Sequence, residues 1–131
     1  MYKTINNEVD IKIISDLLGD FQMSFAENIV FDSNIRLLPD GSIGYGTKDI
    51  NSNSDSFKPN LKMIIGSESA NLRIEFIFED VFTFDYTFDS KMDNWNFLGG
   101  KISDLITRFK LETTYFVITS KTIKYRIVTE N

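Results

Sequence analysis

Carboxylates are the side chains of this sequence with the widest choice of chemistry. The chain has 19 Asp and Glu against 14 Lys and Arg, and it contains no histidine and no cysteine. Nucleophile systems that pair Ser or Cys with His are therefore excluded, as are zinc sites built from His or Cys. A general base would have to be Asp, Glu, Lys or Tyr with a shifted pKa. No motif singles out such a group, so we expect no catalytic residue, no metal site and no cofactor.

A metal-dependent nuclease is the enzyme class that the carboxylates still allow. Such a site needs two or three acids and a Lys near one scissile phosphate. Pro39-Asp40 followed by Asp89-Ser90-Lys91 is similar to that arrangement, with a longer spacing than usual. Pro39-Asp40 also falls in an evident turn, and a net charge of −5 disfavours the approach of nucleic acid. The nuclease is therefore an alternative and not the leading interpretation.

Two further motifs match ligand sites only in part. Asp85, Asp89 and Asp93 recur every four residues, which is not the spacing of a calcium loop. The glycine-rich run GSIGYG has no Lys-Ser/Thr after it and lies in an expected hairpin, not between a strand and a helix. Neither motif predicts a bound cation or phosphate.

The acidic segment itself belongs to an alternating pattern that is typical of a strand. Every second residue from Leu72 to Phe88 is apolar except Asp80. A strand of that length would span roughly 55 Å, which is too long for one edge of a domain of this size. We therefore expect two strands, 71–78 and 81–88, joined at Glu79-Asp80. A bend or an even-numbered turn fits better there than a one-residue bulge, which would shift the alternation.

Patterns elsewhere predict two helices among further strands. Residues 8–18 show helical spacing with Asn7 as a cap, and residues 101–110 show the i, i+3, i+4, i+7 spacing of a short amphipathic helix. Alternating or apolar runs and turn residues predict strands between 21 and 32, a hairpin at 34–47, a strand at 61–65 and a C-terminal hairpin that turns at Lys121. The polar residues 48–60 predict a surface loop.

These elements predict one domain, residues 1–131, with an α+β fold dominated by antiparallel strands. Hydrophobic residues make up 42% of the chain and charged residues 25%, as in ordinary globular proteins. The expected core is drawn from Phe76, Phe78, Phe82, Phe84, Phe88, Phe116, Ile118, Ile123, Tyr125 and Ile127.

The polar face of the alternating segment has two interpretations. It is either a solvated sheet face, partly neutralised by Lys124 and Arg126 of a neighbouring strand, or a negative docking surface for a basic protein. Trp95 is either a lid over the core or an exposed contact residue. In the docking interpretation the partner-binding residues are Glu75, Glu79, Asp80, Asp85, Asp89, Asp93 and Trp95.

Composition limits the cellular location and the classes of partner that we expect for this protein. No apolar run is long enough to span a membrane, and the first residues lack the apolar core of a secretory signal. A sequence pI near 4.7 argues against binding to nucleic acid or anionic membranes. We therefore expect a cytoplasmic protein. It would be a monomer, or a weak homodimer if residues 123–128 form an unpaired edge strand.

The C-terminal half resembles the small acidic, β-rich immunity proteins that accompany bacterial polymorphic toxins. The resemblance covers about residues 61–131 and rests on the order of LRIEFIFEDVFTF, the connector DNW and FVITSKTIKYRIV. It implies a stoichiometric, non-catalytic inhibitor whose acidic surface covers the basic active site of a toxin or nuclease. A phage-encoded inhibitor of a host defence nuclease would use the same surface and is the alternative.

Overall fold

The computed structural model describes residues 1–45, 58–87, 97 and 99–128. Most of the chain forms one antiparallel sheet with the strand order β2-β5-β6-β9-β8-β7, and β1 pairs with β9. The elements are β1 (Lys3–Thr4), α1 (Glu8–Leu17), β2 (Ser24–Asp32), β3 (Ile35–Leu37), β4 (Ile43–Tyr45), β5 (Asn60–Ser67), β6 (Leu72–Tyr86), β7 (Gly100–Asp104), β8 (Phe109–Thr113) and β9 (Phe116–Val128). The expected α+β fold, dominated by antiparallel strands, is confirmed.

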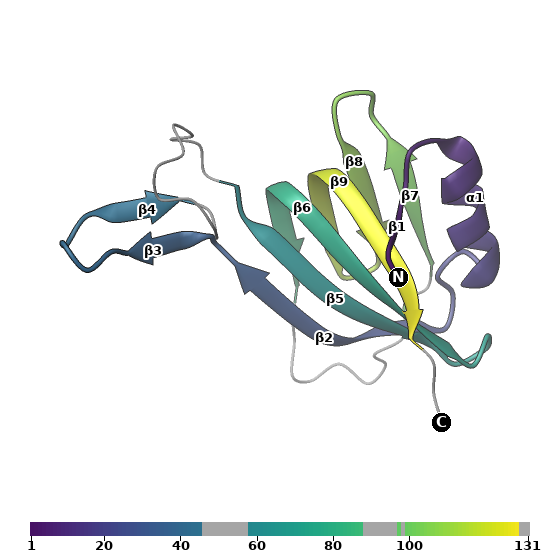
Figure 1. Cartoon of the computed structure of the whole chain (residues 1–131). Coiled ribbons are helices and arrows are strands. Elements are labelled where there is room, and N and C mark those ends of the chain that lie inside the picture. Colours follow the sequence, from purple (N-terminus) through teal and green to yellow (C-terminus); the bar gives the residue numbers. More distant parts are fainter. Residues whose placement is uncertain (46–57, 88–96, 98, 129–131) are drawn as a thin grey trace.

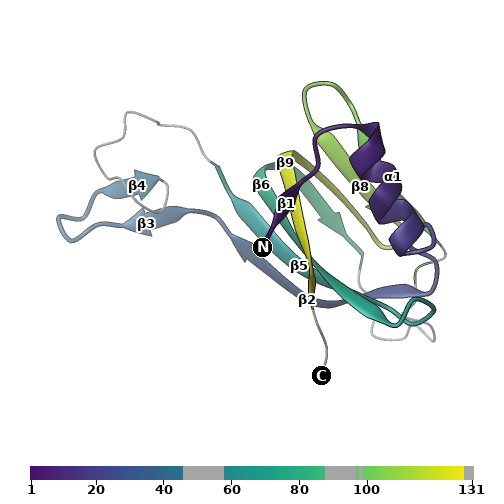
Figure 2. The ribbon, with the colours of Figure 1, turned by 45° about the vertical axis from the view of Figure 1, so that its right-hand side comes forward.

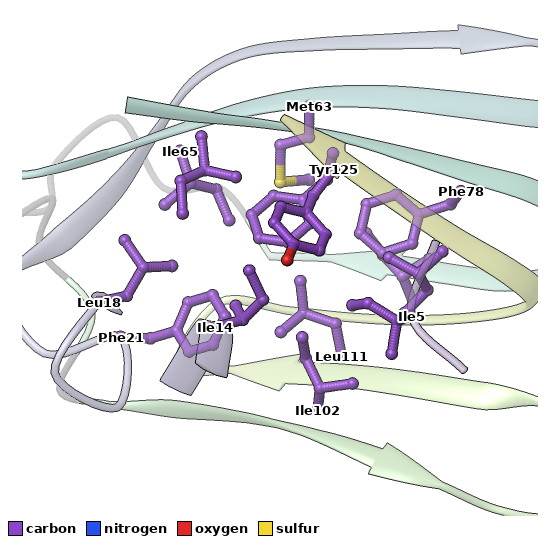
Figure 3. Close-up of a cluster of buried hydrophobic side chains, with 14 of the residues drawn as sticks. Ile5, Ile14, Leu18, Phe21, Met63, Ile65, Phe78, Ile102, Leu111 and Tyr125 are labelled. Carbon is purple, nitrogen blue, oxygen red and sulfur yellow. The ribbon is translucent and has the colours of Figure 1, made fainter. Parts of the chain in front are cut away.

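The sheet is strongly curved, and α1 lies inside the curve near β7 and β8 (Figures 1 and 2). Figure 3 shows Ile14, Leu18 and Phe21 from α1 and the turn after it facing Met63 of β5 and Leu111 of β8. All five side chains are fully buried. The core therefore forms between one helix and the concave face of one sheet.

Helix α1 begins as its sequence predicts. The side chain of Asn7 accepts hydrogen bonds from the backbone N–H groups of Val9 and Asp10, which satisfies two donors of the first turn. The helix ends before Gly19, which has a left-handed φ of +57°. Phe21 also has a left-handed backbone, and this tight turn places its ring in the core.

The long alternating segment forms one strand, β6, and not the two strands expected from its length. The regular strand geometry is nevertheless interrupted at Asp80, as the sequence predicts, because this residue has a left-handed φ of +54°. The pairing with β9 then shifts between Val81 and Thr83, so Phe82 is the extra residue of a β-bulge. Val81 consequently points into the core at 7% exposure, whereas Phe82 is 49% exposed. The expectation that a bulge is disfavoured was wrong.

The expected C-terminal hairpin is also wrong, since residues 116–128 form the single strand β9. Lys121 lies between the pairs Glu79–Thr122 and Val81–Ser120, opposite the irregular part of β6. The two strands bend together and keep their pairing, so no turn is needed. Residues 123–128 are not an edge strand either, because they pair with β6 along their length and β1 lies against Lys124 and Tyr125 on the other side.

The expected helix at 101–110 is a β-hairpin, β7–β8. Ile102 pairs with Leu111, and both are buried, while Leu105 and Ile106 lie exposed in the turn. The backbone N–H of Leu105 donates to the carbonyl of Arg108 and closes that turn. The helical spacing covers only two turns, and backbone pairing with β9 through β8 outweighs such a short pattern.

The predicted core is correct in most positions. Phe76, Phe78, Phe116, Ile118, Ile123 and Tyr125 are buried, and Phe84 is partly buried against them. Phe82 and Ile127 are wrong, because each is about half exposed. Phe88 lies outside the described residues. The bulge explains Phe82, and the position of Ile127 at the end of β9 leaves it without cover.

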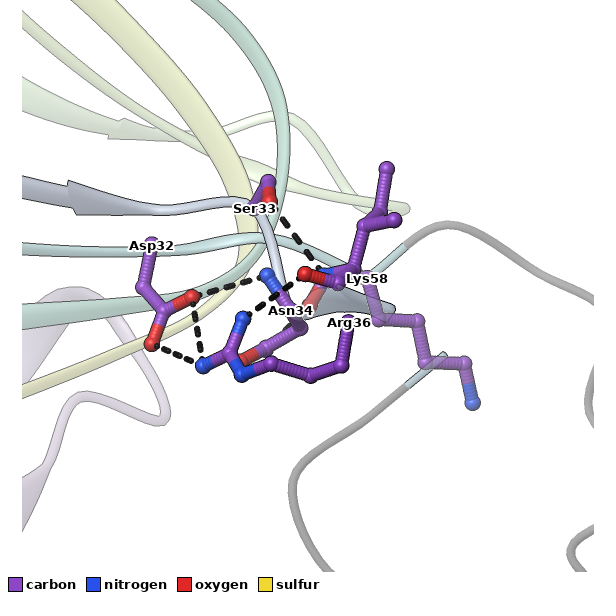
Figure 4. A network of polar contacts seen from close by, with 6 residues as sticks. Asp32, Ser33, Asn34, Arg36 and Lys58 are labelled. Atoms are coloured by element: carbon purple, nitrogen blue, oxygen red, sulfur yellow. Dashed lines mark hydrogen bonds and ion pairs between the residues drawn. The ribbon is translucent and has the colours of Figure 1, made fainter. Parts of the chain in front are cut away.

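The predicted hairpin at 34–47 is confirmed in β3 and β4, which form a separate two-stranded arm beyond the end of β2 (Figure 1). Its base is tied by polar contacts (Figure 4). The guanidinium of Arg36 donates to both carboxylate oxygens of Asp32, and the side-chain amide of Asn34 donates to the carbonyl of Lys58. The predicted loop 48–60 lies mostly outside the described residues, and its last residue, Asn60, begins β5.

Candidate functional site

Glu75 is a buried carboxylate and not part of a solvated face. It lies on β6 at 6% exposure, accepts a hydrogen bond from the hydroxyl of Tyr2, and pairs with Nε of Arg126 at 2.8 Å. Burial raises the pKa of Glu75. The hydrogen bond from Tyr2 and the charges of Arg126 and Lys62 outweigh burial and hold that pKa below its ordinary value. Glu75 is therefore charged and already compensated inside the chain.

Glu79 is the next carboxylate on the same strand. It forms an ion pair with Nζ of Lys124 at 3.2 Å, and both side chains are partly exposed. The expected neutralisation by Lys124 and Arg126 is thus confirmed for Glu75 and Glu79. A basic partner that used either carboxylate would have to compete with a cation of the neighbouring strand.

Asp80 and Asp85 differ from those two residues. Asp85 is exposed, Asp80 is partly exposed, and neither carboxylate forms an ion pair in the part of the chain that the structure describes. The backbone N–H of Asp80 donates to Oδ1 of Asn60, a contact that leaves the carboxylate unused. The other three predicted partner-binding residues, Asp89, Asp93 and Trp95, lie outside the described residues, so their role stays a prediction.

A groove of about 430 Å³ lies at the bulge of β6, and four of its lining residues, 81–84, stand between Asp80 and Asp85 in the sequence. The pairing of β5 with β6 ends at Leu61–Phe78. Beyond it, the N–H of Val81 donates a hydrogen bond to the carbonyl of Pro59, just before β5. The remaining edge of β6 has no strand beside it among the described residues. The groove is mostly apolar and is lined by Phe31, Pro59, Val81, Phe82, Thr83 and Phe84.

Phe82 is the most prominent aromatic residue of the groove. Its ring is 49% exposed, and the guanidinium of Arg108 lies 4.2 Å from the ring centre. This cation–π contact holds the ring in place from the β7–β8 turn. The even alternation of the sequence predicts Phe82 in the core and gives no sign of the bulge itself. Asp80 in the middle of an apolar series was the available signal that the alternation fails there.

A second, larger groove of about 620 Å³ lies at the other end of the sheet. Two of its charged residues, Glu27 and Arg73, are bonded to each other at 2.7 Å, and the third, Glu68, forms no ion pair with the residues that the structure describes. Gly66 leaves room for this pair, since a Cβ at that position would lie 2.8 Å from Oε2 of Glu27. This groove is therefore lined by more polar groups than the groove at Phe82, which is mostly apolar.

The described residues give no support to a metal centre. They contain no group of three or more acidic side chains placed to hold a cation. Asp40, one of the nuclease candidates, accepts hydrogen bonds from the backbone and hydroxyl of Ser42 in the β3–β4 turn, which lowers its pKa. Asp89 and Lys91 lie outside the described residues. Among the residues that are described, no helix is long and apolar enough to cross a membrane.

Comparisons with family models, with curated proteins and with solved structures find no match to this chain. The groove at the bulge of β6 is our candidate site. It combines exposed aromatic surface with two carboxylates, Asp80 and Asp85, that stand on either side of its β6 residues in the sequence.

Proposed function

We propose that this protein is a non-catalytic inhibitor that binds a basic protein, most concretely an immunity protein that neutralises a cognate bacterial toxin. The observation that supports this proposal is the apolar groove on β6, together with Asp80 and Asp85, which bound its β6 residues in the sequence and form no ion pair with the described part of the chain. The resemblance of residues 61–131 to small acidic immunity proteins points in the same direction.

The two features of the groove have different effects on binding. Covering the exposed half of Phe82 would contribute about 1 kcal/mol, half of what full burial of such a side chain provides. Asp80 and Asp85 would mainly raise the association rate and select for a basic partner. The sequence pattern predicts that Glu75 and Glu79 contact the partner. In this proposal Asp80 and Asp85 take that role, because Glu75 and Glu79 are already paired with cations of β9.

The partner can be sought by retention of lysate proteins on the immobilised chain at low and at moderate salt. The proposal expects one basic protein in stoichiometric amount. Retention should fall with Asp80→Lys plus Asp85→Lys and with Phe82→Ser. The control is Asp16→Lys, an exposed acid near the end of α1 whose pair with Lys12 contributes little. Equal retention by all three variants and the original chain would rule out this groove as the binding site.

The kinetics of the isolated pair separate charge from apolar contact. We expect the double Asp variant to slow association, most clearly at low salt, and Phe82→Ser to speed dissociation. Expression of the retained protein then tests the immunity role: it should be toxic alone and harmless when this chain is co-expressed. A phage-encoded inhibitor of a defence nuclease remains the alternative, and a retained host nuclease without toxicity of its own would favour it.

A further inference from the structure

Among the residues that the structure describes, β2 is an edge strand. Within them its strand partner is β5, from Ser24–Ser67 to Asp32–Asn60. On its outer side the described contact is at the beginning of the strand, where the carbonyl of Ser24 accepts a hydrogen bond from the N–H of Phe97 at 2.7 Å. The β3–β4 arm continues away from the end of β2 and does not fold back over this side in either view (Figures 1 and 2).

The last five residues of β2 are unusual for an open edge. After a register shift between Ala26 and Asn28, residues 28–32 (NIVFD) pair regularly with β5. Val30 is 53% and Phe31 48% exposed, on opposite faces of the strand. Edge strands are commonly protected by charged side chains, Pro or a bulge; Glu27 at the register shift protects the first half of β2, whereas residues 28–31 contain no charged residue and no Pro. An apolar edge of this kind favours the addition of another strand.

We propose that a second copy of this chain occupies the edge, with the two β2 strands antiparallel and the two-fold axis at Val30. This register places Val30 opposite Val30 of the other copy on the outer face, and Ile29 opposite Phe31 on the concave face. It also places Asn28 opposite Asp32, so an amide faces a carboxylate and no like charges are opposed.

The self-complementarity of residues 28–32 is the reason to choose a second copy over a foreign peptide. Both exposed apolar side chains, Val30 and Phe31, gain an apolar neighbour. The carboxylate of Asp32, which already accepts hydrogen bonds from Arg36 and from the backbone of Asn34, faces an amide and not a second acid. An isologous contact of this kind is the commonest way in which identical chains associate. Five residues bury little surface, so we expect a dimer that forms only at high protein concentration.

The dimer contact and the groove of the proposed function share one residue, Phe31, but Val30 and Phe82 each belong to only one of them. Val30 pairs with Lys62 of β5 and does not line the groove, whereas Phe82 lines the groove and lies on β6, away from β2. Substitution of Val30 therefore tests the dimer without altering the groove, and substitution of Phe82 does the reverse. Loss of partner binding would not be mistaken for loss of dimerisation.

Sedimentation velocity over a range of concentrations provides the test. We expect the original chain to approach a dimer at high concentration. Val30→Glu should weaken dimerisation at least tenfold, because it places two carboxylates opposite each other on the axis. The folded monomer tolerates the same change, since the new carboxylate lies beside Lys62. Urea unfolding of the variant verifies that the fold is retained.

A mixture of two variants tests the register itself. Val30→Glu and Val30→Lys should each be monomeric alone and should form a heterodimer when mixed, because opposite charges then meet on the axis. The matched controls are Val9→Glu and Val9→Lys, since Val9 is 68% exposed on α1. The controls should dimerise like the original chain. A monomeric original chain at millimolar concentration, or a mixture that stays monomeric, would overturn the proposal.

Discussion

The Glu75 carboxylate on β6 and the Arg126 guanidinium on β9 form a 2.8 Å charged hydrogen bond at a point where Glu75 is buried and Arg126 is partly exposed. Arg126 also lies over the ring of Tyr2, whose hydroxyl donates to Glu75. The three side chains tie β6, β9 and the N-terminal segment together. The pair therefore has consequences for stability and for its dependence on pH.

Substitution of Glu75 by Gln should lower the free energy of unfolding at pH 7 by roughly 1.5–3 kcal/mol, the range for a hydrogen bond to a charged group. Glutamine keeps the shape and one acceptor for Tyr2 but removes the charge that faces Arg126. Urea unfolding measures the loss. Glu79→Gln is the control, because its pair with Lys124 is more exposed and should cost less than about 1 kcal/mol. Equal losses would contradict the special role of Glu75.

The difference in the free energy of unfolding between the original chain and Glu75→Gln should depend on pH. The folded pKa of Glu75 lies below its ordinary value of 4.5, so the carboxylate adds stability above that value and loses it as the pH falls through the lower, folded pKa. The original chain should therefore lose stability in acid faster than Glu75→Gln. Unfolding curves from neutral pH to below pH 4 provide the measurement. A constant difference between the two chains would show that the Glu75 charge is not the cause.

Ile106 occupies a strained backbone position in the β7–β8 turn. It has a left-handed φ of +76°, and its side chain is 96% exposed. Ile106→Gly should raise the free energy of unfolding by roughly 0.5–1 kcal/mol. The substitution removes about 1–2 kcal/mol of backbone strain, which exceeds the cost of about 0.4–1 kcal/mol from the greater entropy of the unfolded chain. Leu105→Gly, without a left-handed backbone, should instead lower it by roughly 0.5–1 kcal/mol. Thermal unfolding distinguishes the two variants.

The cap of α1 gives a prediction with a neighbouring control. Asn7→Ala should cost about 1 kcal/mol, because two backbone N–H groups of the first turn lose their acceptor. Asn6→Ala should have little effect, since its backbone N–H, and not its side chain, bonds to Asp10. Circular dichroism during urea unfolding reports both. Equal effects at the two positions would contradict the observed cap.

The bulge in β6 is tested by two adjacent substitutions. Val81→Ala should cost about 1.5 kcal/mol, from two buried carbons at about 0.8 kcal/mol each. Phe82→Ala should cost less than about 1 kcal/mol, chiefly its contact with Arg108. Had the simple alternation continued, Phe82→Ala would cost roughly 3–5 kcal/mol. Urea unfolding decides between the two arrangements.

Local features of the chain are those that the sequence predicts well. Asn7 and Gly19 bound α1, and turn residues between short apolar runs give the β3–β4 hairpin. Both rest on backbone groups that bond to near neighbours in the chain, so a short window contains the necessary information. The apolar strand faces that contribute Phe76, Phe78 and Ile118 to the core follow from the same local alternation.

The tertiary structure decides the features that depend on partners distant in sequence. Residues 101–110 become strands because β8 pairs with β9, and β9 passes Lys121 without turning because β6 bends with it. The groove joins Phe31, Pro59 and Phe82 from three separated segments, and it exists because β5 ends before β6 does. Local patterns in the sequence are enough to predict an acidic, strand-rich chain and the capped helix at residues 8–18. Only long-range pairing decided which carboxylates are neutralised and which aromatic ring faces solvent.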